Sequence, residues 1–382
     1  MIQSPEEKNH GGFPMNFQPF EYMAWAKEHS RRPGHQMLQS GMRTFPEKFL
    51  GEPPLDITLE EVDPYGPKAV REKLAARLDL TPEEVFLSGG GSSLGLFLVC
   101  QTLLERGDLV LAESPGYQAL HRVPLLAGAR VEPLPRSPRL GWAPDEEALE
   151  EGLERGARMV LLTNLHNPTG VLLEEEDLAR IARKVHRAGA VLVVDEVFSE
   201  FLPPGKRPRS AHALLPEAVT LASFTKVFGL GSLRAGWVLA PPSLVVKLEQ
   251  WNDMVQVGNP TLPFKVLERV LDQEEALRAW LAEAMEGVRA GLEILAASPL
   301  VEFHPPAGGV TLFASLKGLQ DTGPLCRFLA EEKEVHVVPG AFFQDPSRIR
   351  IGLSLPRPEL DQALKAFLES VETYLLSEKK RP

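Results

Sequence analysis

The chain lacks most features of secreted, membrane and nucleic-acid-binding proteins. Its 382 residues include only two cysteines, Cys100 and Cys326, too few for a disulfide framework or a cysteine-based metal site. Cys100 lies in an apolar run and is predicted to be a buried free thiol. A net charge of −11 and the lack of a basic stripe argue against a nucleic-acid partner. We therefore predict neither a bound metal nor a nucleic-acid ligand.

Long apolar runs are missing too. The apolar runs have the length of strands and are too short to span a bilayer, so no membrane segment is predicted. Residues 1–8 contain no basic segment followed by an apolar core, so we expect no signal peptide and a cytoplasmic location. The apolar content of 43% and charged content of 24% are typical of a globular protein, long enough for two domains.

From about residue 66 the sequence alternates between helix-like and strand-like segments. The predicted strands are short continuous apolar runs, a pattern typical of a mostly parallel sheet covered on both faces. They lie at 85–87, 109–112, 159–163, 191–194, 218–223 and 237–240, among helices at 68–78, 92–105 and 174–188. The C-terminal part is helical at 263–297 and 358–376, with strands at 310–315, 335–338 and 348–353. We predict an α/β fold with a smaller α+β domain.

The run Ser223-Phe-Thr-Lys226 is followed closely by Arg234 in a glycine-flanked stretch. This spacing can hold a phosphate and an aldehyde together. A serine hydroxyl and an arginine fork bind the phosphate, and a lysine amine forms a Schiff base with the aldehyde. The alternative is a solvated lysine that follows a strand.

Two polar residues upstream make chance less plausible. Asn167 lies in Asn167-Pro-Thr-Gly170, and Asp195 follows the apolar run 191–194. Taken singly, the first motif is a good turn sequence and the second an ordinary strand end.

A third motif, Ser88-Gly-Gly-Gly-Ser92, stands between a predicted strand and a helix, where bare amides and a helix N-terminus form an anion site. Its simpler interpretation is a flexible turn.

In this order, the motifs resemble those of the fold-type I pyridoxal-phosphate enzymes, in particular the class I/II aminotransferases. The resemblance covers nearly the whole chain. It implies pyridoxal 5'-phosphate as cofactor and a homodimer. It also implies a large cofactor-binding domain at 46–260 and a small domain formed by 1–45 together with 261–382.

The resemblance assigns roles around the cofactor ring. Lys226 holds the aldehyde, and Asp195 faces the pyridine nitrogen and keeps it protonated. Asn167 donates its amide to the phenolic oxygen, and the Asn167–Pro168 bond is expected to be cis. Tyr117 stacks on the ring.

Further residues are expected to bind the cofactor's phosphate and the substrate. The resemblance implies a phosphate cup formed by Gly90, Gly91, Ser92, Ser223 and Arg234, with Tyr65 reaching the phosphate of the neighbouring subunit. For the substrate, Arg350 is expected to bind the α-carboxylate, with Arg348 as its rival on the same strand face. Asn167 and Gly41 are expected to line the same pocket. Arg43 is expected to be solvated, although it can also meet a substrate carboxylate.

Two residues near these motifs stand apart from the family pattern. Phe198 occupies the position of a tyrosine that usually donates to the phenolic oxygen. With one donor fewer, the Schiff base of Lys226 is predicted to be more basic than usual. His166 matches no family role and is predicted to be structural.

The leading hypothesis is transamination between an L-amino acid and a 2-oxo acid by a ping-pong mechanism, with Lys226 as general base and then acid. A second hypothesis keeps the cofactor but breaks another bond, as in a β-lyase or a decarboxylase. A remote third is a non-catalytic sensor. The identity of the substrate side chain is not encoded in any motif found in this sequence.

Overall fold

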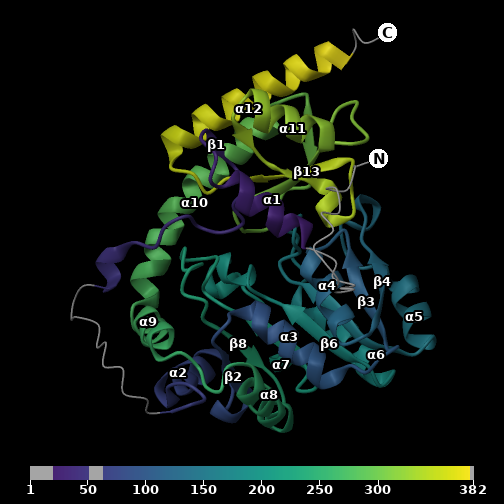
Figure 1. Cartoon of the computed structure of the whole chain (residues 1–382), viewed down its shortest axis with the longest axis vertical. Coiled ribbons are helices and arrows are strands. Elements are labelled where there is room, and N and C mark those ends of the chain that lie inside the picture. The colour runs from purple at the N-terminus through teal and green to yellow at the C-terminus, as the bar shows by residue number, and fades with distance from the viewer. Residues whose placement is uncertain (1–19, 51–62, 379–382) are drawn as a thin grey trace, which may run out of the picture.

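A computed structural model of the chain describes residues 20–50 and 63–378. Its largest element is a seven-stranded sheet with the order β2-β8-β7-β6-β5-β3-β4, in the lower part of Figure 1. The strands are β2 (Val85–Ser88), β3 (Leu109–Ser114), β4 (Arg130–Pro135), β5 (Ala157–Thr163), β6 (Val191–Asp195), β7 (Val219–Ala222) and β8 (Gly236–Leu239). All neighbours are parallel except β8, which is antiparallel to both β2 and β7.

Alternate residues of the central strands pack on opposite faces of this sheet. In β5, Met159 and Leu161 join one core cluster, and Val160 and Leu162 join another. The first cluster lies under α3 (Ser92–Leu103), α4 (Gln118–Leu126) and α8 (Pro242–Val255), and the second under α5 (Glu146–Glu154), α6 (Glu175–Arg187) and α7 (Ala211–Leu214). Helices on both faces explain why these strands read as continuous apolar runs, and they confirm the predicted fold class.

A smaller antiparallel sheet lies in the upper part of Figure 1, with the order β12-β13-β10-β9. Its strands are β9 (Val301–Phe303), β10 (Thr311–Leu316), β12 (Val338–Pro339) and β13 (Arg348–Gly352), and a separate short pair joins β1 (His35–Gln36) to β11 (Val335–His336). The helices of this part are α1 (Glu21–His29), α10 (Glu274–Ala296), α11 (Gly323–Glu332) and α12 (Arg357–Glu378). The predicted helix 263–297 is two helices, α9 (Thr261–Asp272) and α10.

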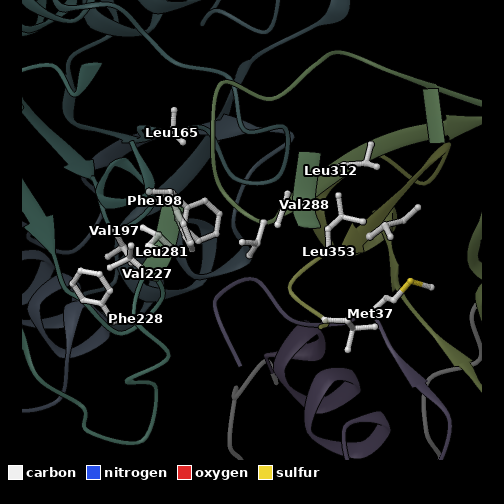
Figure 2. Close-up of a cluster of buried hydrophobic side chains, with 14 of the residues drawn as sticks. Met37, Leu165, Val197, Phe198, Val227, Phe228, Leu281, Val288, Leu312 and Leu353 are labelled. Atoms are coloured by element: carbon white, nitrogen blue, oxygen red, sulfur yellow. The ribbon is translucent and has the colours of Figure 1, made fainter. Parts of the chain in front are cut away.

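One core cluster joins the two parts of the molecule. Figure 2 shows it running from Val227 and Phe228 at one side to Leu312 and Leu353 at the other. Leu281 and Val288, both on α10, belong to the same cluster. The apolar residues of α10 therefore pack against both parts, which fixes the strand ends of the large sheet relative to the small sheet.

A buried glutamate with three salt bridges also holds this junction together. The Glu200 carboxylate binds Arg77 of α2 (Lys68–Leu78) at 2.7 Å, Arg207 at 2.5 Å and Arg278 of α10 at 2.6 Å. Burial alone would raise the pKa of Glu200, but the three guanidinium groups outweigh it and lower the pKa to about 2. The carboxylate therefore stays charged and holds α2 and α10 to the segment that follows Asp195.

Both cysteines are buried free thiols, as predicted for Cys100. Within the described ranges, none of the helices has the length and apolar character needed to cross a membrane.

Candidate active site

The residues singled out from the sequence lie at the carboxyl ends of neighbouring strands. Tyr117 follows β3, Asn167 follows β5, Asp195 ends β6 and Lys226 follows β7. In the register of the sheet, Asp195 stands between Thr163 of β5 and Leu221 of β7. Parallel strands bring their carboxyl ends to one edge, where α/β proteins bind ligands.

The Asp195 carboxylate forms no salt bridge within the described part of the chain. Its Oδ1 accepts a hydrogen bond from the Val197 amide at 3.0 Å. Burial raises its pKa to about 6, only partly offset by that amide and by the charge of Lys226. A cationic ligand beside it would relieve this cost, and the protonated ring nitrogen of pyridoxal phosphate is such a cation.

The backbone of Asn167 is fixed by a hydrogen bond to Thr163. Its backbone amide donates to the Thr163 hydroxyl at 2.8 Å, and that hydroxyl donates to Glu113. The Asn167 side chain is 9% exposed, and its Oδ1 has no hydrogen-bond partner among the described residues. Its amide is therefore fixed in place with bonding capacity left for a ligand.

The layer beneath these residues contains a buried ion pair and a neutral histidine. Glu113 and Arg136 lie 3.0 Å apart, and both side chains are fully buried. His166 donates from Nε2 to the Pro115 carbonyl at 2.8 Å and accepts at Nδ1 from the Thr169 hydroxyl at 2.7 Å. Burial, reinforced by Arg136, lowers the pKa of His166 well below its usual value. Both ring nitrogens are engaged, as expected for a structural histidine.

The cis bond expected at Asn167–Pro168 is not there. In the described part of the chain, the cis peptide bonds are Ser114–Pro115 and Asn164–Leu165. The prediction was wrong: Asn167 and Pro168 lie inside a turn that is closed by the Gly170 amide donating to the His166 carbonyl at 2.7 Å, and the bond between them is trans.

Lys226 carries the amine that the sequence assigns to the cofactor. Its Nζ donates to the Ser40 hydroxyl at 3.0 Å. Burial lowers its pKa, and Arg350 and Arg234 add to that effect against Tyr22 and Asp195. A lysine with a lowered pKa is more often neutral, and the neutral amine is the nucleophile.

Gly41 lies directly against the backbone of Lys226. A Cβ at this position would lie 2.9 Å from both the Cα and the carbonyl oxygen of Lys226. The next amide, Met42, donates to that carbonyl at 2.8 Å. Only glycine allows this close approach.

The glycine loop and Arg234 form one cup. Gly91 has a φ of 73°, and Ser92 begins α3. Arg234 donates from Nη2 to the Gly90 carbonyl at 2.8 Å. The two sides of the cup meet at Gly236, where a Cβ would lie 2.8 Å from the Ser92 amide and 3.0 Å from the Ala222 carbonyl.

Ser223 follows Ala222 directly and shares a 2.7 Å hydrogen bond with the Thr225 hydroxyl. The amides at the start of α3, this hydroxyl and an arginine suit a phosphate dianion. The donor set fits pyridoxal phosphate at this end of the site, as Asp195 fits it at the other.

Arg350 is fully buried and has donors to spare. Its Nη2 donates to the Tyr22 phenol at 2.8 Å and to the Leu38 carbonyl at 2.9 Å. Its Nε and Nη1 have no hydrogen-bond partner in the part of the chain that the structure describes. Because a buried guanidinium with open donors is costly, these atoms indicate a site for a carboxylate.

Arg348, the rival candidate, is already engaged. It pairs with Asp345 at 3.1 Å, and its guanidinium lies 4.8 Å from the ring centre of Trp142. The open donors on this strand therefore belong to Arg350.

Two other predicted residues lie outside this cluster. The Tyr65 hydroxyl donates to Asp253 at 3.3 Å, and that carboxylate is the first cause of its raised pKa. Arg43 is partly exposed and pairs with Glu359 at 3.4 Å.

Tyr117, by contrast, joins the cluster. Burial raises its pKa well above the ordinary value, so its phenol stays protonated. Its ring lies 6.2 Å from that of Tyr22, almost perpendicular to it.

Sequence reasoning missed Tyr22 and Ser40. Burial alone would raise the pKa of Tyr22, but the charges of Arg350 and Lys226 outweigh it and lower the pKa. Neither residue lies in a recognisable motif, and each reaches the site only through a contact between distant segments.

The chain is similar to known proteins over most of its length. A family model described as "Aminotransferase class I and II" matches residues 58–367. Capreomycidine synthase of Streptomyces vinaceus is 31% identical over 346 residues, covering 89% of this chain and 88% of that protein. Aspartate/prephenate aminotransferase of Thermus thermophilus is 26% identical over 322 residues, covering 80% of this chain and 81% of that protein.

Among solved structures, an aminotransferase from Mycobacterium tuberculosis has a TM-score of 0.83 at 22% identity, covering 94% of this chain and 98% of that chain. The pyridoxal-phosphate-dependent cyclase OrfR has a TM-score of 0.82 at 26% identity, covering 96% and 99%.

Proposed function

Because the chain belongs to the class I and II aminotransferase family and its cofactor is pyridoxal 5'-phosphate, we propose that it transfers an amino group between an L-amino acid and a 2-oxo acid. One constellation carries the proposal. A lysine amine of lowered pKa interacts electrostatically both with the Asp195 carboxylate, whose pKa is raised, and with Arg350, a buried arginine with two open donors among the described residues.

The residues divide the work by position. Pyridoxal phosphate, when bound, supplies the electron sink that makes the α-proton of the amino acid acidic. Asp195 keeps a proton on the ring nitrogen, and Asn167 donates to the phenolic oxygen. The amides of Gly90, Gly91 and Ser92, the Ser223 hydroxyl and Arg234 hold the phosphate.

On the substrate side, the open Nε and Nη1 of Arg350 bind the α-carboxylate. Lys226 removes the α-proton as a neutral amine and returns it as an ammonium. Tyr117 packs on the ring, and Gly41 leaves room beside the lysine.

Steady-state kinetics test the proposal. The protein loaded with cofactor is assayed with a panel of L-amino acids, each with and without 2-oxoglutarate. Transamination predicts continued 2-oxo-acid release only when the acceptor is present, about one equivalent per active site without it, and parallel initial-rate lines when both substrates are varied. Intersecting lines, or continued release of product without an acceptor, would count against it.

A second candidate function is β-elimination, with or without closure of a ring. What favours an alternative to amino transfer is the similarity to capreomycidine synthase and to the cyclase OrfR. These relatives are named for reactions other than amino transfer. Decarboxylation gains no support, because it needs the carboxylate away from Arg350. The names of the relatives are those of enzymes, which also leaves the sensor alternative without support.

We also propose a homodimer whose contact surface includes the end of α8. Met254 is 69% exposed and Val257 is 81% exposed, an unusual exposure for apolar side chains. Tyr65 lies beside them through its bond to Asp253, and a dimer across this surface would carry it toward the neighbouring phosphate. A Met254→Asp/Val257→Asp variant is expected to sediment as a monomer.

The division into domains stays a proposal as well, with 46–260 assigned to the large domain and 1–45 with 261–382 to the small one; residues 1–19, 51–62 and 379–382 of these ranges lie outside the described residues. We propose a cytoplasmic location, since both cysteines are unpaired thiols and disulfides are rare in reducing compartments.

A further inference from the structure

A series of polar groups connects Lys226 with Tyr22 and Arg350. Lys226 donates from Nζ to the Ser40 hydroxyl at 3.0 Å, and Ser40 is a hydrogen-bond partner of the Tyr22 phenol. Arg350 donates from Nη2 to the same phenol oxygen at 2.8 Å. Ser40 and Tyr22 are each 6% exposed. Lys226 and Arg350 are the donors at the two ends of this series, and the Ser40 hydroxyl and the phenol oxygen accept from them.

Tyr22 is held rigidly at this position. Its backbone amide donates to Gln118 Oε1 at 2.9 Å, and its ring lies 5.7 Å from Phe343 and 6.0 Å from Phe20. The Arg350 guanidinium lies 4.9 Å from the centre of the ring. The phenol oxygen is therefore held at hydrogen-bonding distance from the arginine that is proposed to bind the α-carboxylate.

Transamination gives such a group no task, because one proton moves with Lys226 and the β-carbon keeps all its bonds. Loss of a substituent from the β-carbon is different. A hydroxyl or alkoxyl group leaves only when an acid protonates its oxygen. A phenol that accepts two hydrogen bonds gives up its proton more readily than a free one.

We propose that Tyr22 is a catalytic acid that protonates an oxygen leaving group on the β-carbon of an L-amino acid, and that Ser40 passes the proton from Lys226 back to Tyr22. This inference rests on the β-elimination proposed above. The substrate class is L-amino acids with a β-oxygen substituent.

The protons and electrons balance within the site. The Lys226 amine takes the α-proton, and the electrons of the C–H bond form a second bond between the α- and β-carbons. The β-carbon–oxygen bond breaks, its electron pair leaves with the oxygen, and Tyr22 supplies the proton that makes water or an alcohol. Lys226 is then an ammonium and Tyr22 a phenolate. One proton passing from Lys226 through Ser40 to Tyr22 restores both.

Two substrates with different leaving groups test the acid. Chloride leaves without a proton, whereas hydroxide needs one, so pyruvate release is compared for 3-chloro-L-alanine and L-serine. Tyr22→Phe is expected to slow turnover of L-serine by about 10²- to 10⁴-fold and to leave turnover of 3-chloro-L-alanine close to that of wild type. Tyr374→Phe, which removes a phenol from α12, is the matched control and should change neither.

Ser40→Ala tests the relay separately. The first turnover of L-serine uses a phenol that is already protonated, so it should proceed at the wild-type rate. Later turnovers should be slower, giving a burst of pyruvate. A variant without a burst and with wild-type steady-state turnover would remove Ser40 from the relay.

A measurement without cofactor checks the same group. The chain has four tyrosines, so phenol ionisation can be followed by absorbance in the cofactor-free protein. The charged and titratable groups facing Tyr22 are Arg350, Lys226 and Tyr117. Tyr22→Phe should remove one transition below the ordinary tyrosine pKa of 10.0.

The outcomes separate the two proposals. If wild type releases pyruvate from neither substrate, β-elimination itself is wrong and this inference falls with it. If wild type eliminates chloride but not hydroxide, the inference alone is overturned. The same holds if Tyr22→Phe slows both substrates equally, or removes no transition below the ordinary value, because Tyr22 would then only position Arg350.

Discussion

The half of the site on the large sheet and the half that faces it are assembled in different ways. Asp195, Asn167 and Lys226 each follow a strand of one parallel sheet, so neighbouring strand ends bring them together. On the facing half, the hydrogen bond from Arg350 to Tyr22 joins residues 328 apart in the chain. Segment 38–42 links the halves, because Leu38 binds Arg350, Ser40 binds Lys226 and Met42 binds the Lys226 backbone.

The two halves are therefore expected to have different tasks, the reaction of the cofactor in one and the choice of substrate in the other. On the roles proposed above, the sheet half holds the groups that any reaction of this cofactor needs, and the facing half decides which substrate atoms meet a donor. Substitutions on the sheet half should abolish all reactions together, and substitutions on the facing half should change substrate binding or the bond that is broken while the cofactor stays in place.

The largest effect is expected at Lys226. Lys226→Ala removes both the attachment of the cofactor and the general base, so all turnover should fall by about 10⁴-fold or more. The cofactor should then be lost on dialysis, while thermal unfolding stays cooperative. A variant that retains turnover would show that another residue is the general base. The two halves of the site would then not differ in the way proposed.

Arg350 should affect binding more than chemistry. Arg350→Met removes two charge-assisted hydrogen bonds to the substrate carboxylate, each contributing about 1.5–3 kcal/mol, so kcat/KM should fall by at least about 100-fold. Arg348→Met is the control on the same strand, and it should leave kcat/KM near wild type because Arg348 pairs with Asp345. Equal losses in the two variants would contradict the assignment.

Asp195 should lower the stability of the protein while it serves the reaction. Its pKa rises from 3.8 to about 6 on folding, so the folded protein binds more protons than the unfolded chain between these values. The free energy of unfolding of the cofactor-free protein should therefore fall as the pH rises from about 4 to about 6.

Asp195→Asn should remove that fall and be more stable than wild type by about 3 kcal/mol at pH 7, at about 1.4 kcal/mol per pKa unit. Chemical denaturation of both proteins at pH 4 and pH 7 measures the difference. Equal pH dependence would mean that the carboxylate is better solvated than its burial indicates.

The smallest effect is expected at Phe198. It is 7% exposed and packs 6.1 Å from Phe201 in the core cluster of Figure 2. Phe198→Tyr adds one donor toward the cofactor's phenolic oxygen, and one hydrogen bond shifts the absorbance titration of the bound cofactor down by at most about one pH unit. An unchanged titration would show that this position does not face the cofactor.

The sheet half was predictable because its signals are local. Continuous apolar runs such as 191–194 indicated buried parallel strands, and polar residues at their ends marked the site. Strand β4 was missed, since it lies at the edge of the sheet and contains Pro133 and Pro135, which argue against a strand. Tyr22 and Ser40 were missed for another reason. Their role arises from contacts with Arg350 and Lys226, which only tertiary packing brings near.

Chemical trapping of the cofactor tests the central claim most directly. The loaded protein is reduced with borohydride, digested, and its modified peptide sequenced by mass spectrometry. We predict that the cofactor is found on Lys226. Its recovery on another lysine, or a protein that takes up no pyridoxal phosphate at all, would contradict this account.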